Sequence, residues 1–136
     1  MGRRESREAA VKLLYQYNFQ QDSLEEIIEL FFENDIEFVA PDIEKDYVLD
    51  VVNGVIRDCE KIDKLIESNS KDWQLSRMPK LDVAVLRVAV FEMLSRDDIP
   101  ASVSINEAVE TAKKYSHEEA GNFINGILGS IFTELE

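Results

Sequence analysis

The segment Leu81-Asp-Val-Ala-Val-Leu-Arg-Val-Ala-Val-Phe-Glu-Met-Leu94 decides the fold class of this chain. Eleven of its fourteen residues are apolar, and they leave no broad polar face. A helix that is apolar nearly all round is covered by protein on most sides. The segment is shorter than the roughly 20 residues of a membrane-spanning helix and longer than most strands, which rarely exceed about ten. It therefore predicts a central buried helix in a soluble, all-helical protein.

Three charged residues of this segment need a structural reason, because an unpaired buried charge is costly. We expect Asp82 to be exposed in the first turn, where an acid suits the helix dipole. Arg87 and Glu92 are expected to form ion pairs inside the protein. Asp82 and Glu92 are about 15 Å apart along the helix axis, so they cannot act on one substrate atom as a catalytic pair.

Apolar spacing predicts six further helices and no strand. Asp22-Ser23, a connector at 34–41 and a break near 57–60 separate the first four helices, and a loop at 68–72 follows the fourth. Later helices are expected at about 103–115 and after Ser116. Trp73, Leu75 and Met78 are interpreted as isolated apolar anchors before the central helix.

Serine and glutamate three residues apart form the capping box of a helix start. This spacing occurs at Ser23 with Glu26, Ser104 with Glu107 and Ser116 with Glu119, and Asp42 can cap a further helix.

Two glycines fall inside predicted helices. Gly54 serves either close packing or a bend. Asn125-Gly126 is a hairpin signal, but the apolar residues around it keep helical spacing, so we reject the hairpin.

Length and composition indicate one globular domain covering residues 1–136. The single cysteine, Cys59, cannot form an internal disulfide, which fits a reducing cytoplasm. No basic-then-apolar leader opens the chain, so neither a signal peptide nor a membrane anchor is expected.

The net charge of −13 disfavours nucleic-acid binding by a uniform surface. The charge is distributed unevenly: residues 1–20 and 69–96 each carry +2, whereas 21–68 carry −11 and 97–136 carry −6. Basic side chains are thus concentrated in the first turns and before the central helix.

Metal and nucleophile chemistry lack the residues that they need. One histidine, His117, and one cysteine, Cys59, cannot form a zinc cluster. We interpret His117 as a solvated loop residue and Cys59 as a small buried side chain. Nucleotide-binding glycine motifs and Gly-x-Ser-x-Gly are absent from the sequence. No enzymatic activity, metal or cofactor is expected.

Arg3, Arg4 and Arg7 lie about one helical turn apart and can cluster. Such a run can be merely a solvated N-terminus, but basic arms also bind nucleic acids. The motif Lys113-Lys114-Tyr115 and Phe123 strengthen the second interpretation, because single-stranded RNA is bound by basic side chains and stacking aromatics. Phenylalanine is, however, more often a core residue, and the residues alone leave both interpretations open.

Five segments carry a more specific signal through their order and spacing. They are Arg3-Arg-Glu-Ser-Arg-Glu-Ala-Ala with Leu14-Tyr15, Trp73-x-Leu-x-Arg77, Leu81-Asp-x-Ala-Val-Leu-Arg-x-Ala-x-Phe-Glu92, Ile105-Asn-Glu-Ala-Val-Glu-x-Ala-Lys113 and Phe123-Ile-Asn-Gly-Ile-Leu128. With these segments the chain resembles the NusB family of bacterial transcription antitermination factors over essentially its whole length. The resemblance implies an all-α, seven-helix bundle arranged as two packed three-helix subdomains.

The resemblance also implies a function. A NusB-like protein is expected to bind boxA RNA of nascent ribosomal RNA transcripts jointly with small-subunit ribosomal protein ten (Nus factor E), within an RNA polymerase elongation complex that contains other Nus factors. The residues that match the family's RNA-binding positions are Arg3, Arg4, Arg7, Asn122 and Phe123, and those that match its partner-binding positions are Tyr15 and Asp82. Three phosphate contacts predict a salt slope of only about −2, so the partner is expected to raise boxA affinity.

Two other functions stay open. The same helical module resembles the N-terminal RNA-binding part of some cytosine-5 ribosomal RNA methyltransferases, although no glycine-rich strand–turn–helix for a methyl donor is present. The chain could also be an acidic helical adaptor without direct RNA contact. Self-association into a homodimer is not decided by the sequence.

Overall fold

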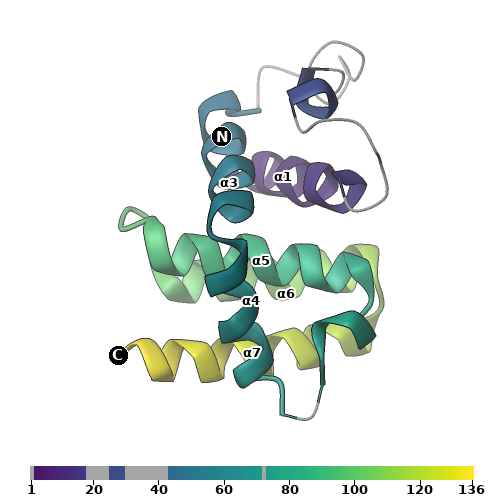
Figure 1. Cartoon of the computed structure of the whole chain (residues 1–136), viewed down its shortest axis with the longest axis vertical. Coiled ribbons are helices and arrows are strands. Elements are labelled where there is room, and N and C mark those ends of the chain that lie inside the picture. The colour runs from purple at the N-terminus through teal and green to yellow at the C-terminus, as the bar shows by residue number, and fades with distance from the viewer. Residues whose placement is uncertain (1, 18–24, 30–42, 72) are drawn as a thin grey trace.

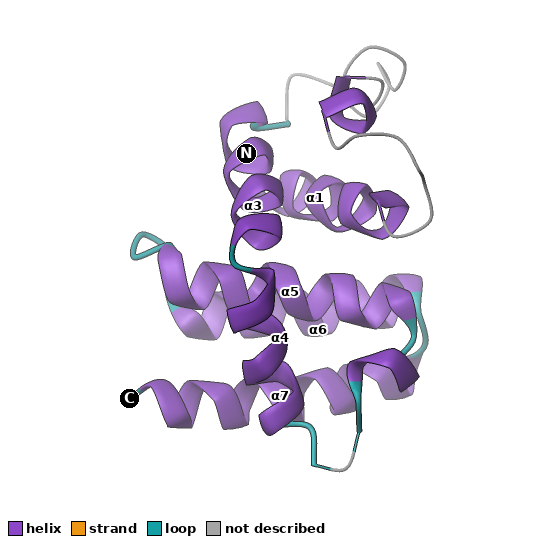
Figure 2. Cartoon of the chain, viewed as in Figure 1, coloured by secondary structure: helices purple, strands orange, loops and turns teal. Residues whose placement is uncertain are grey.

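The computed structural model describes residues 2–17, 25–29, 43–71 and 73–136. Its elements are α1 (Arg3–Tyr17), α3 (Lys45–Arg57), α4 (Cys59–Ser68), the 3-10 turn η1 (Leu75–Arg77), α5 (Lys80–Ser95), α6 (Ala101–Tyr115) and α7 (Glu118–Leu135). Residues 25–29 are also helical. Within these ranges no residue is in a strand, which confirms the predicted all-α class (Figure 2).

Helix α5 is the element against which the others pack. Ten of its sixteen residues are buried, and it contacts α1, α3, α4, α6 and α7. Figure 1 shows α5 in the middle of the molecule, between α1 with α3 on one side and α7 on the other. The prediction of a central buried helix is confirmed.

The helices form two groups around α5. Helices α1 and α3 pack together in the first group, while α6 and α7 pack against α5 and against each other in the second (Figure 1). Helix α4 continues the direction of α3 and crosses from one group to the other. This grouping agrees with the predicted pair of packed helical subdomains.

The predicted helix break and the role of Gly54 are both resolved by packing. Helix α3 ends at Arg57 and α4 begins at Cys59, which confirms the break near 57–60. Gly54 is buried inside α3, and a Cβ atom built there would overlap the ring of Phe91 from α5. Gly54 therefore serves close packing. Asn125-Gly126 lies within α7, so rejecting the hairpin was correct.

Two of the predicted capping boxes are wrong. The cap of α6 is Pro100, so Ser104 lies inside the helix, where it is buried and its hydroxyl donates to a carboxylate of α5. The cap of α7 is His117, whose Nδ1 accepts a hydrogen bond from the backbone N–H of Ala120 at 3.2 Å. The imidazole takes the role predicted for Ser116 because His117 has the extended backbone that a capping residue needs. The predictions for Ser23 and Asp42 lie outside the described residues.

The packing at Gly54 predicts opposite effects for two glycine-to-alanine substitutions. Gly54→Ala is expected to destabilise the fold by about 1–3 kcal/mol, because the Phe91 ring must move. Gly126→Ala is the matched control, since no atom lies within 4 Å of a Cβ built at this position. It should stabilise α7 by up to about 1 kcal/mol. Urea unfolding midpoints would measure both, and equal midpoints for the two variants would contradict the close packing.

Candidate functional site

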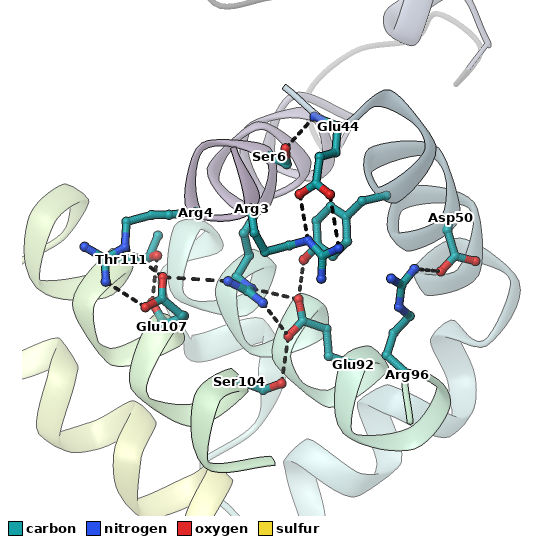
Figure 3. A network of polar contacts seen from close by, with 12 residues as sticks. Arg3, Arg4, Ser6, Glu44, Asp50, Glu92, Arg96, Ser104, Glu107 and Thr111 are labelled. Carbon is teal, nitrogen blue, oxygen red and sulfur yellow. Dashed lines mark hydrogen bonds and ion pairs between the residues drawn. The ribbon is translucent and has the colours of Figure 1, made fainter. Parts of the chain in front are cut away.

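A buried carboxylate joins four helices beneath the N-terminal arginines. Glu92 of α5 has no exposed surface. It accepts hydrogen bonds from Arg7 Nε at 2.7 Å and Nη2 at 3.2 Å, and from Ser104 Oγ at 2.7 Å. The hydroxyl of Tyr47 also donates to it. Because Arg7, Tyr47 and Ser104 come from α1, α3 and α6, this one side chain fixes three helices against α5 (Figure 3).

Arg7 belongs to this buried network. Its exposed fraction is 5%, and its Nη1 also lies 3.7 Å from Glu107 Oε1. Burial by itself would lower the pKa of Arg7, but the hydrogen bonds and charge of Glu92 raise it above its ordinary value. The pKa of Tyr47 is raised by burial and by the Glu92 charge, so its hydroxyl stays protonated as a donor. The sequence predicted that Arg3, Arg4 and Arg7 would cluster, but Arg7 is buried whereas Arg4 is exposed.

Arg3 and Arg4 point outward, and each is held by a carboxylate. Arg3 forms two hydrogen bonds to Glu44, at 2.9 and 3.2 Å, and its guanidinium lies 4.6 Å from the centre of the Tyr47 ring. Arg4 forms two to Glu107, at 2.8 and 2.7 Å, with its side chain 60% exposed. The Arg4 hydrogen bonds hold the pKa of Glu107 below its ordinary value, so this carboxylate is charged at neutral pH.

The outward arginines border an open surface depression. Its lining includes Arg3 and Arg4 from α1 and an apolar edge of Pro100 and Val103 at the start of α6. Val103 is 41% exposed. We call these four residues the arginine surface. Paired guanidinium groups beside apolar side chains can bind a phosphate together with the sugar or base attached to it.

Two residues of the motif Lys113-Lys114-Tyr115 contact α1. Tyr115 donates its hydroxyl to Glu8 at 2.8 Å, and Lys114 Nζ lies 3.3 Å from the same carboxylate. This contact brings a basic and an aromatic group from α6 beside α1, and the Glu8 carboxylate offsets the charge of Lys114. Tyr115 remains half-exposed.

Asn122 and Phe123 lie on α7, away from the arginine network. Asn122 is exposed, whereas Phe123 is partly buried and packs against the core. The Phe123 ring also meets Trp73 edge to face, with ring centres 6.0 Å apart and planes at 70°. Trp73 is 51% exposed, so its interpretation as an apolar anchor was wrong. Its place in an otherwise polar loop after Ser68 was the signal that could have identified it as a surface residue.

The two predicted partner-binding residues differ in accessibility. Tyr15 of α1 is 37% exposed, but Asp82 of α5 is only 2% exposed, which corrects the prediction of an exposed first turn. Burial raises the pKa of Asp82, while Ser116 and His117 oppose the shift. The Asp82 side of the first turn of α5 thus faces Ser116 and His117 at the junction between α6 and α7. Asp82 Oδ1 has no hydrogen-bond partner among the described residues.

The other charged residue of α5 behaves as predicted. Arg87 forms two hydrogen bonds of 2.9 Å to Asp63 of α4. With the Glu92 pairs, this confirms that the inner charges of the central helix are satisfied within the protein.

The described part of the chain holds no group of three or more His, Cys, Asp or Glu side chains placed to bind a metal ion. None of its helices is both long enough and apolar enough to span a membrane.

These features define a small all-helical protein with an arginine surface at the start of its first helix. The chain belongs to the NusB family, whose model matches residues 4–132. A relative from Acetivibrio thermocellus, named transcription antitermination protein NusB, is 54% identical over 131 residues, which are 96% of this chain and 88% of the relative.

Solved structures share the fold. NusB from T. maritima superposes with a TM-score of 0.83 at 36% identity, covering 98% of this chain and 92% of that one. The fold also matches a structure of the antitermination factors NusB and NusE in complex with double-stranded RNA. That match has a TM-score of 0.74 at 24% identity and covers 97% of this chain and 96% of the other.

The difference between Arg7 and Arg4 predicts unequal effects on stability. Arg7→Ala leaves Glu92 buried without its charged partner, and breaking such a pair costs about 3–5 kcal/mol. Arg4→Ala removes a solvent-exposed pair on the same helix and should leave the unfolding midpoint almost unchanged. Urea unfolding followed by circular dichroism would compare them, and similar midpoints would show that the Glu92 network does not stabilise the fold.

The buried position of Asp82 predicts a pH-dependent effect of Asp82→Asn. A carboxyl whose pKa is raised by folding is tolerated in its protonated form and destabilises the fold as the pH rises through that pKa. Asp82→Asn should therefore match the wild type near pH 3 and become increasingly more stable than it toward pH 7. Thermal melts across this range would measure the difference, and a constant difference would contradict the raised pKa.

Proposed function

We propose that this protein is a transcription antitermination factor that binds boxA RNA of nascent ribosomal RNA transcripts together with small-subunit ribosomal protein ten (Nus factor E). It would act without enzymatic activity, in the cytoplasm, within an RNA polymerase elongation complex that contains other Nus factors. The family, the relative named as an antitermination protein and the solved complex of NusB and NusE with RNA support the proposal. The observation that carries it is the outward pair Arg3 and Arg4 on a protein of net charge −13.

The geometry of the arginine surface limits how tightly the protein alone can bind RNA. With Arg7 buried, Arg3 and Arg4 are the two arginines of the cluster that a phosphate can reach. Two contacts to a single strand correspond to a salt slope of about −1.4. Each phosphate must also displace a carboxylate, Glu44 or Glu107, from its arginine. RNA binding by the isolated protein is therefore weak and needs further contacts.

A basic ribosomal partner supplies those contacts. The acidic surface attracts a basic protein and steers its association, and the docked partner adds its own phosphate contacts beside the arginine surface. In this proposal Tyr15 contacts the partner directly, whereas buried Asp82 shapes the end of α5 on which the partner rests. Figure 1 shows the end of α1 and the start of α5 at the same end of the molecule. Self-association into a homodimer through the same end of the molecule stays a prediction.

Fluorescence anisotropy of a labelled boxA RNA tests the proposal. The full chain alone should bind weakly, and an equimolar amount of ribosomal protein ten should raise the affinity at least tenfold. Arg4→Ala should weaken RNA binding by the protein pair, because one phosphate contact is lost. Arg57→Ala is the matched control, since Arg57 is equally exposed and also paired with a carboxylate, but lies at the end of α3.

Equal affinities with and without the partner would overturn the joint binding. Equal losses for Arg4→Ala and Arg57→Ala would show that the RNA responds only to net charge. If neither the protein nor the pair binds boxA RNA, the acidic adaptor becomes the better description.

A further inference from the structure

The segment before α5 carries an exposed tryptophan, Trp73. Trp73 is 51% exposed, and it is the only tryptophan of the chain. An indole left half in water is costly in hydrophobic free energy. Its one described ring contact is the edge-to-face contact with Phe123, and about half of its surface remains accessible to a ligand.

Backbone contacts hold this tryptophan in place. The oxygen of the buried Ser70 hydroxyl lies 2.6 Å from the carbonyl oxygen of Trp73 and 3.0 Å from that of Glu67, and its single proton is donated to one or the other. The Glu67 carboxylate accepts the backbone N–H of Leu75 at 3.0 Å. Lys71 takes a left-handed backbone with φ of 46°, a conformation that is uncommon for a residue other than glycine. These contacts fix the backbone of the turn at Trp73, and the edge-to-face contact with Phe123 is the described ring contact of its indole.

Three cations lie close to Trp73 in the sequence and form no ion pair with a carboxylate among the described residues. Lys71, Arg77 and Lys80 are all exposed, and none forms an ion pair with any residue that the structure describes. This differs from Arg3, Arg4 and Arg7, each of which is paired. A phosphate that binds these cations displaces no carboxylate of the described residues from them, unlike a phosphate at Arg3 or Arg4.

We propose that Trp73 with Phe123, flanked by Lys71, Arg77 and Lys80, is a second RNA contact, here called the tryptophan surface. An unpaired base stacks on the exposed face of the indole, and the three cations hold the phosphates on either side of it. This inference rests on the proposed function and extends it, because it assigns base stacking and unpaired positive charge to a segment separate from the arginine surface. The ligand is single-stranded RNA, since the bases of a duplex are stacked on one another and cannot stack on a side chain.

The unique tryptophan allows a direct test. Titrating the full chain, bound to ribosomal protein ten, with an unlabelled boxA RNA should quench Trp73 fluorescence in parallel with the anisotropy curve of the labelled RNA. An oligonucleotide of the same length in which abasic sites replace the bases is the control. It keeps the phosphates but cannot stack, so it should bind more weakly and leave the emission nearly unchanged.

Substitutions separate stacking from charge. Trp73→Ala should weaken boxA binding about 5- to 100-fold, the range measured for loss of one stacked base. Trp73→Phe should restore most of the affinity. Phe132→Ala is the matched control, since Phe132 is an exposed aromatic of α7 and lies outside both surfaces. Thermal melts should show that none of these variants is unfolded.

The cations are tested against a control variant of the same net charge. Lys71→Ala/Arg77→Ala should reduce the salt slope of boxA binding by about 1.4, because two single-strand contacts are lost. Lys61→Ala/Lys64→Ala removes the same charge from two exposed lysines of α4 and should leave the slope unchanged.

The outcomes distinguish this inference from the function on which it rests. If boxA RNA binds the protein pair but Trp73 emission stays constant and Trp73→Ala binds normally, the tryptophan surface is wrong and the proposed function stands. If Trp73→Ala weakens binding of ribosomal protein ten and leaves RNA affinity of the assembled pair unchanged, the surface binds protein, which also overturns the inference. If no RNA binds to the pair, both proposals fail.

Discussion

The buried ion pair between Arg7 and Glu92 is the constraint on which the rest of the structure depends. A carboxylate without exposed surface must have every strong acceptor position satisfied, and Glu92 achieves this only when three helices meet α5 at one point. The requirement fixes the rotation of α1 about its own axis. It turns Arg7 inward, while Arg3 and Arg4, one turn earlier at the start of the helix, pair with Glu44 and Glu107.

On the resulting surface each outward arginine is paired with a carboxylate, so the positive and negative charges offset each other. Each outward arginine already has a carboxylate, so the protein can hold a basic cluster on a strongly acidic chain without a local excess of positive charge. If RNA binds here as we propose, it competes with an internal carboxylate for each arginine. At the tryptophan surface it meets cations that have no such partner among the described residues. In these proposals one RNA binds both surfaces, displacing carboxylates at the arginine surface and no described carboxylate at the tryptophan surface.

The fold was largely predictable because the buried apolar residues of a helix recur along the sequence with helical spacing. The dense apolar run of α5, the break between α3 and α4 and the helical spacing around Asn125-Gly126 all follow from local pattern, and all were confirmed. The caps were less predictable. Ser104 and Ser116 have the right spacing, but Ser104 is used by a distant carboxylate and His117 provides the cap of α7. A hydroxyl that can reach a buried charge contributes more there than at a helix end.

The sequence by itself determined the helical class, the central helix, the internal pairing of Arg87 and Glu92 and the family. These follow from apolar periodicity and from residue spacing, which are local properties. Only the tertiary structure decided which side chains face water. Arg7 and Asp82 are buried and Trp73 is exposed, contrary to what their positions in the chain suggested. The physical reason is that exposure depends on which other helix covers a residue, and the segments that cover Asp82 and Arg7 are distant from them in sequence.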